Sequence, residues 1–278
     1  MRPSPAMRGP VMNTTPYYRL LGPLSVMMQG KEVPIKGKRH KALMAVLLLE
    51  ANNVVDIESL IDAMWGESPP MTAKSQVRIC VSELRRRFSL SGEWAGIETH
   101  PSGYLLRVPD GTFDLFRFTG LVREGRRAAD VGHTESAAAD LRAALDLWQG
   151  PIAPGVESLL VRSAAARYEE DRLTVLEEYF DLELLVGNHS RVVGELTREV
   201  SQNPFRERMC GQLMLALYLS NRQVDALSLF QSTRRRLVDD LGLEPSRALR
   251  DIEDAILSGA VAPLPDARFR AKVLSPLK

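Results

Sequence analysis

The sequence predicts an α+β winged helix-turn-helix domain followed by an all-α, tetratricopeptide-like helical domain. Three observations predict this order. Short extended segments bounded by Gly and Pro come first. Three stretches with helical periodicity follow, and a short hairpin pattern closes the first domain. Beyond Asp114 the strand patterns stop, and amphipathic helices continue to about Leu257 with an internal repeat of nearly tetratricopeptide length.

The composition at the two ends separates them from the domains. The first fifteen residues are rich in Pro and small residues, which is typical of disorder, and the segment from Ala262 onward contains three prolines. We therefore expect four segments: a disordered extension (1–15), a winged-helix DNA-binding domain (16–110), a helical domain (111–260) and a flexible tail (261–278).

The extended segments are predicted by β-branched, aromatic and other apolar residues between turn signals. Strands are expected at Tyr17–Leu21, Leu24–Met28 and Glu32–Ile35. Gly22-Pro23 and Gln29-Gly30 separate them, because these residue types favour turns.

The three helices are predicted by apolar residues at steps of three and four. The first runs from Lys38 to Glu50, and the second is capped by Asp56 and ends at Trp65. The third runs from Ala73 to Phe88 after Thr72. Two extended pieces around a Pro-Ser-Gly turn then predict a β-hairpin, Ile97–Thr99 and Tyr104–Val108.

The helical domain contains a repeated pattern. Asn188 and Asn221 are 33 residues apart, and each follows an apolar stretch and precedes a helix. A helix pair that recurs near 34 residues is the tetratricopeptide period. The apolar residues expected to correspond are Val192, Val193 and Leu196 in one copy, and Val224, Leu227 and Leu229 in the next. Trp148 and Phe205 are expected in the core.

Charge and cysteine content narrow the class of protein. Residues 1–110 hold 14 Lys and Arg against 10 Asp and Glu, whereas residues 111–278 hold 22 against 25, so the two halves suggest different partners. Two distant cysteines fit a reducing compartment. The first residues lack the apolar run of a signal peptide, and the longest apolar stretch, Ala42–Leu49, is too short for a membrane span. A cytoplasmic protein with no membrane partner is expected.

The third helix gathers its basic residues on one side. On a helical wheel Val77, Val81, Leu84 and Phe88 fall within roughly 60° and predict the buried stripe. Arginine can contact guanine O6 and N7, and Lys and Ser can hold phosphates or base edges. The candidate DNA-binding residues of this recognition helix are Thr72, Lys74, Ser75, Arg78, Ser82, Arg85 and Arg86. A solvated helix end is the alternative interpretation of the arginine run.

Two further regions are candidates for DNA contact. The tip of the hairpin, His100, Ser102 and Gly103, is the expected wing, while Tyr104 is expected to pack against the third helix. At the start of the first helix, Lys38, Arg39 and Lys41 are candidates for the phosphate backbone, and a plain solvated helix start is an equal alternative.

Several motifs resemble the Streptomyces antibiotic regulatory protein (SARP) family of transcriptional activators. In the first domain these are LLLEAN (47–52), MWGESPP (64–70), VSELRR (81–86) and SGYLLRV (102–108). In the second they are ALDLWQG (144–150), NPFRE (203–207) and LGLEPS (241–246), which resemble the family's bacterial transcriptional activation domain. The departures are Cys80 and the start of the third helix at Ala73, which leave the operator sequence open.

The resemblance implies an OmpR-like winged helix and a tetratricopeptide-like activation domain. It implies a sequence-specific activator of antibiotic or secondary-metabolite biosynthetic genes, bound to direct repeats near the promoter as two copies side by side. It also implies RNA polymerase and its sigma factor as partners. The chain contains no G-x-x-x-x-G-K-[ST] motif, so it resembles the small members that carry no ATPase module.

Other function classes find little support in the sequence. The four histidines are dispersed and no H-E-x-x-H or G-x-S-x-G motif occurs, so neither an enzyme nor a cofactor or metal site is expected. A protein-binding scaffold and a repressor share the predicted architecture and stay open as alternatives. Replacing Arg78 or Arg85 by Ala is expected to weaken specific DNA binding and to leave the fold intact.

Overall fold

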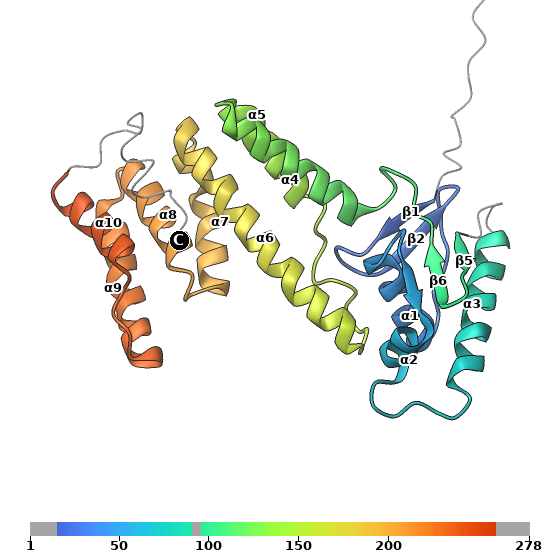
Figure 1. Ribbon diagram of the computed structural model, residues 1–278. Coiled ribbons are helices and arrows are strands. Elements are labelled where there is room, and N and C mark those ends of the chain that lie inside the picture. Colours follow the sequence, from blue (N-terminus) through green and yellow to red (C-terminus); the bar gives the residue numbers. More distant parts are fainter. Residues whose placement is uncertain (1–15, 91–95, 260–278) are drawn as a thin grey trace, which may run out of the picture. The chain divides into compact units, whose positions relative to one another are not determined.

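The computed structural model describes residues 16–90 and 96–259 (Figure 1). The expectations for residues 1–15 and 261–278 concern residues outside these ranges. The chain forms two compact units: one comprises Met1–Leu121 and Ala144–Arg172, and the other comprises Val122–Ala143 and Leu173–Lys278. Each unit is therefore built from two separate stretches of sequence.

The first two strands lie within the segments that the turn residues predict, whereas the third shares only Glu32 with the expected Glu32–Ile35. β1 (Tyr17–Arg19), β2 (Ser25–Met28) and β3 (Lys31–Glu32) form an antiparallel sheet in that order. Tyr18 pairs with Val26, and both side chains are buried. The alternating pattern therefore directs one face of this small sheet into the core.

Three helices follow in the predicted order: α1 (Lys38–Leu49), α2 (Ile57–Trp65) and α3 (Ala73–Leu90). Asp56 caps α2 as expected, because its carboxylate accepts a hydrogen bond from the Ser59 backbone N–H at 2.8 Å. This bond and one from the Ser59 hydroxyl hold the pKa of Asp56 below its usual range.

A second sheet combines one strand that precedes α3 in the chain with two strands that follow it. β4 (Val54–Asp56), β5 (Ile97–Thr99) and β6 (Gly103–Leu106) pair antiparallel in the order β4-β6-β5. Glycine is required at position 103, because an added Cβ would lie 1.9 Å from the Val55 carbonyl oxygen. The hairpin β5–β6 is therefore anchored to β4 by a close backbone approach.

Asp114 ties the end of the winged region to the N-terminal sheet. It begins α4 (Asp114–Asp130), and its carboxylate accepts hydrogen bonds from the backbone N–H groups of Leu20 and Leu21 at 2.9–3.0 Å. Burial raises the pKa of Asp114 to about 6, although these N–H donors partly offset the effect. Trp148, half-buried, meets Phe118 edge to face at 5.6 Å in the same unit.

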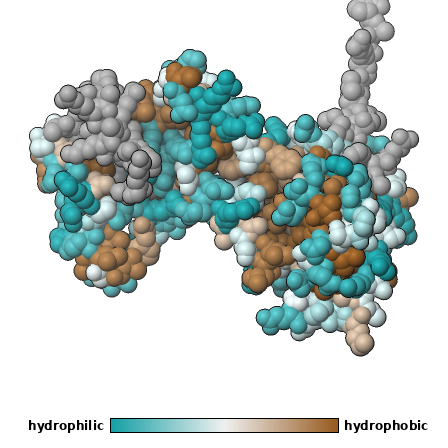
Figure 2. All heavy atoms as spheres, in the orientation of Figure 1, coloured by the Kyte–Doolittle hydropathy of each residue, from teal (hydrophilic) through white to brown (hydrophobic). Residues whose placement is uncertain are grey.

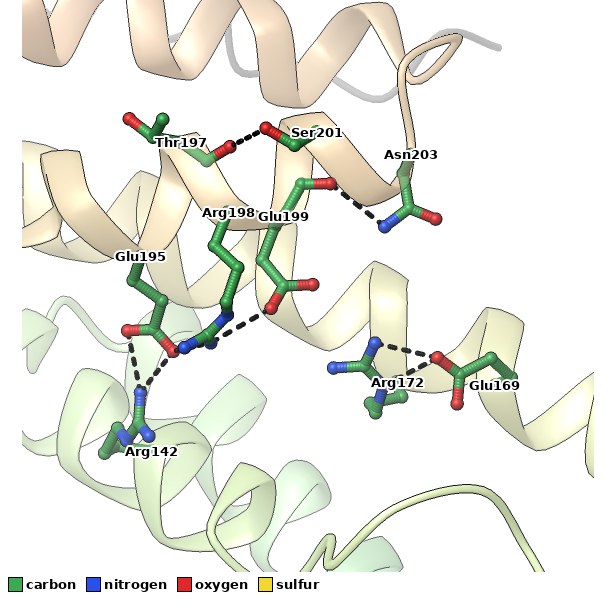
Figure 3. A network of polar contacts seen from close by, with 9 residues as sticks. All are labelled: Arg142, Glu169, Arg172, Glu195, Thr197, Arg198, Glu199, Ser201 and Asn203. Atoms are coloured by element: carbon green, nitrogen blue, oxygen red, sulfur yellow. Dashed lines mark hydrogen bonds and ion pairs between the residues drawn. The ribbon is translucent and has the colours of Figure 1, made fainter.

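From α4 to Gly259 the described residues form helices and their connections, without a named strand, as predicted. The elements are α5 (Thr134–Leu145), α6 (Leu159–Val186), α7 (His189–Gln202), α8 (Glu207–Leu219), α9 (Gln223–Leu241) and α10 (Arg247–Leu257). Within the second unit Arg142 of α5 donates to Glu195 of α7 at 2.8 Å, and Arg198 joins this cluster (Figure 3).

The repeat is visible in burial, with a register different from the expected one. Pairs of buried positions lie 34 residues apart in α7 and α9: Val192 with Ala226, Leu196 with Phe230, and Glu199 with Thr233. The expected correspondence of Val192 with Val224 is wrong, because Val224 is 78% exposed. The buried positions of α9 are set by its packing on α8, which local sequence similarity did not reveal.

A buried ionic network joins α6 to α8 in the second unit. Arg206 and Arg208 pair with Glu177 and Asp181, and the Gln212 amide donates to the Glu177 backbone carbonyl at 2.8 Å. Burial raises the pKa of Glu177 to about 7 and also raises that of Asp181. The ionised carboxylates of Glu177 and Asp181 therefore need their arginine partners to be stable in this buried position.

Some apolar residues reach the surface. Phe205, expected in the core, is 45% exposed, because it lies in the connection between α7 and α8. Figure 2 shows hydrophobic residues at the surface of the molecule. In the first unit, the exposed side chains of Val54 and Leu160 border a hollow of about 510 Å³. Among the described residues, no helix combines the length and apolarity needed to cross a membrane.

Candidate nucleic-acid interface

The buried face of α3 is the predicted one. Val77, Val81, Leu84 and Phe88 are each at most 1% exposed. They occupy steps of four, three and four residues, so that one stripe of the helix packs into the first unit. The opposite side of the helix is thereby turned to solvent.

The exposed face of α3 consists of Ser75, Arg78, Ile79, Ser82 and Arg86, all of which are exposed. Among the described residues, none forms an ion pair or hydrogen bond with the side chains of Arg78 and Arg86. Two guanidinium groups with free donors on a solvent-facing helix can bind phosphates or the guanine edge. The structure thus brings together four of the residues expected to contact DNA: Ser75, Arg78, Ser82 and Arg86.

Arg85 points toward the hairpin. Its Nε donates to the Ile97 carbonyl at 2.9 Å, and its terminal nitrogen donates to the Thr99 hydroxyl at 2.8 Å. The guanidinium also lies 5.8 Å from the ring centre of Tyr104. Tyr104 is buried and lies against this α3 side chain, as expected, and Arg85 fastens the β5–β6 hairpin to the helix. Figure 1 shows the hairpin beside α3.

The N-terminal end of α3 is held by polar contacts within the first unit. Lys74 pairs with Glu58 of α2 at 2.6 Å. The Thr72 hydroxyl accepts a hydrogen bond from the Gln76 side chain at 2.9 Å. Gln76 in turn accepts one from Arg39 at 2.8 Å. This chain of contacts fixes the start of α3 relative to α1.

The basic residues at the start of α1 differ in their surroundings. Arg39 lies 5.2 Å from the ring centre of Trp65, so its guanidinium links α1, α2 and α3. Lys38 pairs with Glu157 at 3.1 Å, with both side chains largely exposed. Lys41 is exposed, and the described residues include no polar partner for it.

The hairpin tip forms a tight turn. The backbone N–H groups of His100 and Gly103 each donate to the carbonyl of the other, at 2.9 and 3.2 Å. Ser102 is exposed at the tip, whereas Gly103 is buried against β4. The His100 ring approaches Glu98 at 3.7 Å, and the hydrogen bond from Arg107 holds the pKa of Glu98 below its usual range.

Two features of this surface were missed by sequence reasoning. Ile79 is 57% exposed among the polar residues of the exposed face, and its position on the wheel, opposite Val77, could have revealed it. The bridging role of Arg39 depends on three helices meeting in space. No local pattern carries that information.

Comparison with known proteins assigns a class to each half of the chain. Residues 113–257 match the bacterial transcriptional activator domain. Residues 30–106 match the C-terminal domain of transcriptional regulatory proteins. The regulatory protein DnrI of Streptomyces peucetius is 34% identical over 246 residues, which cover 86% of this chain and 90% of DnrI.

The chain belongs to the SARP family of transcriptional regulators. The regulatory protein AfsR of Streptomyces coelicolor is 36% identical over 241 residues, which cover 86% of this chain and 24% of AfsR. The transcriptional regulatory protein EmbR of Mycobacterium tuberculosis is 36% identical over 247 residues, which cover 86% of this chain. The chain spans only 63% of the length of EmbR.

A solved structure shows the SARP architecture directly. Mycobacterium tuberculosis EmbR, in complex with a low-affinity phosphopeptide, superposes with a TM-score of 0.85 at 34% identity. The match covers 93% of this chain and 68% of the EmbR chain. The winged N-terminal domain and the helical domain are thus confirmed, and the chain is related to regulators rather than to enzymes.

Proposed function

We propose that this chain is a sequence-specific, DNA-binding transcriptional activator of antibiotic or secondary-metabolite biosynthetic genes. One observation carries the proposal: the exposed face of α3 presents Arg78 and Arg86 with free guanidinium donors and short serines beside them. An α-helix fits the major groove, where arginine can bind guanine through two hydrogen bonds. The membership of the SARP family supports the same conclusion.

The contacts divide into three kinds. Arg78, with Ser75 and Ser82 beside it, is proposed to contact base edges, and Arg86 and Lys41 to contact phosphates. Ser102 and His100 at the hairpin tip are proposed to reach the neighbouring groove or backbone. Arg39, Lys74 and Arg85 have protein partners in this structure, so we propose that they mainly position the helix and the hairpin.

We infer the arrangement of the operator and the transcription partners from the family resemblance. Direct repeats place two copies head to tail, each with α3 in a major groove on one side of the duplex. The helical domain is proposed to contact RNA polymerase and its sigma factor, because stacked helix pairs present extended surfaces for a partner.

A footprint and a transcription assay test the proposal together. Promoter fragments beside the gene of this protein are treated with nuclease in its presence, and the same fragments are transcribed by polymerase holoenzyme. We expect protection of two adjacent repeats and increased transcript. Protection with reduced transcript identifies a repressor. If no fragment shows protection that decreases as the salt concentration rises, the result supports the protein-binding scaffold.

A further inference from the structure

The exposed face of α3 contains one side chain that neither the core nor the charges explain. Ile79 is 57% exposed, although isoleucine is among the residues most often buried. A branched aliphatic residue in the middle of a solvent-facing helix gains nothing from packing. It also has a lower helix propensity than lysine, glutamine or alanine.

The position of Ile79 on the helix is specific. Ser75, Ile79, Ser82 and Arg86 follow each other at steps of four, three and four residues, so they form one stripe. The buried stripe has the same steps and begins two residues later, at Val77, which places it on the opposite side of the helix. Ile79 thus lies near the centre of the surface that faces most directly away from the core.

The neighbours of Ile79 let it protrude. The serines on either side have short side chains, and Arg86 is two turns farther along, about 10 Å by the rise of a helix. Against a major groove, this stripe places an aliphatic group at the floor while the arginines reach the edges. The one apolar group on the floor of that groove is the C5-methyl of thymine.

We propose that Ile79 is a specificity-determining residue that recognises the C5-methyl group of a thymine in the operator. The proposal rests on the proposed DNA-binding function and names one base class within its site. A protein partner is less favoured, because the other members of the stripe are serines and an arginine. The hollow of about 480 Å³ beside Ile79 is lined largely by polar and charged residues, among them Arg39, Gln76 and Glu83.

Deoxyuridine substitution isolates the methyl group. In the promoter fragment that the protein protects, each thymine is replaced singly by deoxyuridine, which removes only the C5-methyl group and leaves base pairing intact. Affinities of the full chain are measured by fluorescence anisotropy for the wild type, Ile79→Ala and Val224→Ala. Val224 is the matched control, because it is an exposed aliphatic residue of the second unit.

The expected result is a single sensitive thymine. Its replacement should weaken wild-type binding about four-fold, the value for one buried methyl-sized group. Ile79→Ala should bind the unmodified site less tightly by at least a similar factor and should be insensitive to that replacement, whereas Val224→Ala should behave as the wild type.

Several outcomes overturn the proposal. Wild-type binding that is indifferent to every replacement, or sensitivity that persists in Ile79→Ala, excludes methyl recognition by this residue. Normal DNA binding by Ile79→Ala with reduced transcription would assign Ile79 to a protein partner. If the wild type binds no promoter fragment, the proposed function itself fails, which is a separate result.

Discussion

Replacing Arg85 by Ala should separate holding the hairpin from contacting DNA. The side chain donates a part-buried hydrogen bond to Ile97 and an exposed one to Thr99, and it lies over Tyr104. The first bond is worth about 1 kcal/mol, the exposed one about half as much, and the cation–π contact about 0.5 kcal/mol. We expect the free energy of unfolding of the first unit to fall by about 2 kcal/mol.

Urea unfolding followed by tryptophan fluorescence measures this loss. Tryptophan occurs only at positions 65, 94 and 148, all within the sequence ranges of the first unit. With a slope of about 2 kcal/mol per molar urea, the midpoint should fall by about 1 M. Arg86→Ala is the matched control and should leave the midpoint within about 0.3 M of the wild type, because Arg86 is exposed.

The salt dependence of DNA binding distinguishes the two roles. An arginine that contacts a phosphate contributes about 0.9 to the slope of log K against log salt concentration. Arg86→Ala should reduce that slope by about this amount, whereas Arg85→Ala should weaken binding without changing it. A reduced slope together with unchanged stability in Arg85→Ala would refute the positioning role and return Arg85 to the DNA contacts.

Four further substitutions test the fold of the two units. Gly103→Ala should destabilise the first unit by about 3 kcal/mol in urea unfolding, because its Cβ would collide with β4. Gly120→Ala in α4, where nothing lies within 4 Å, should instead stabilise it by about 1 kcal/mol. The pKa of Asp114 near 6 lies above its usual value, so the stability it contributes is present at low pH and lost as the pH rises through 6. The unfolding free energy of the wild type relative to Asp114→Asn should therefore fall by about 2 kcal/mol from pH 4.5 to 7, and equal curves would contradict this. Arg208→Met should lower the unfolding free energy of the second unit by about 3 kcal/mol by circular dichroism, since it leaves the buried Asp181 without its ion pair, and a neutral effect would exclude that dependence.

The sequence predicted the elements of the winged region well, because their signals are local. Asp56 lies at a helix start where its carboxylate can reach a free N–H group, and the structure shows that bond. The stripe from Val77 to Phe88 follows from helical geometry alone. A glycine in the hairpin turn predicted the bend, although its close approach to β4 could not be foreseen.

The hydrogen-bond partners of long side chains could not be predicted from the sequence. Arg85 and Arg86 are neighbours with the same chemistry, yet one bonds to a strand twelve residues away and the other faces solvent. The difference is about 100° of rotation around the helix, together with the position of a hairpin that no local pattern fixes. Phe205 shows the same limit, because its exposure depends on where the connection between α7 and α8 ends.

The most direct test of the account is the affinity of the double variant Arg78→Ala/Arg86→Ala for the protected promoter fragment, measured by fluorescence anisotropy at fixed salt. Arg78 is expected to contribute about 1–3 kcal/mol through a base contact, and Arg86 a similar amount through charge-assisted hydrogen bonds to a phosphate. Binding should therefore weaken by at least about 25-fold while the urea midpoint stays at the wild-type value. An affinity equal to that of the wild type would show that the exposed face of α3 does not bind DNA.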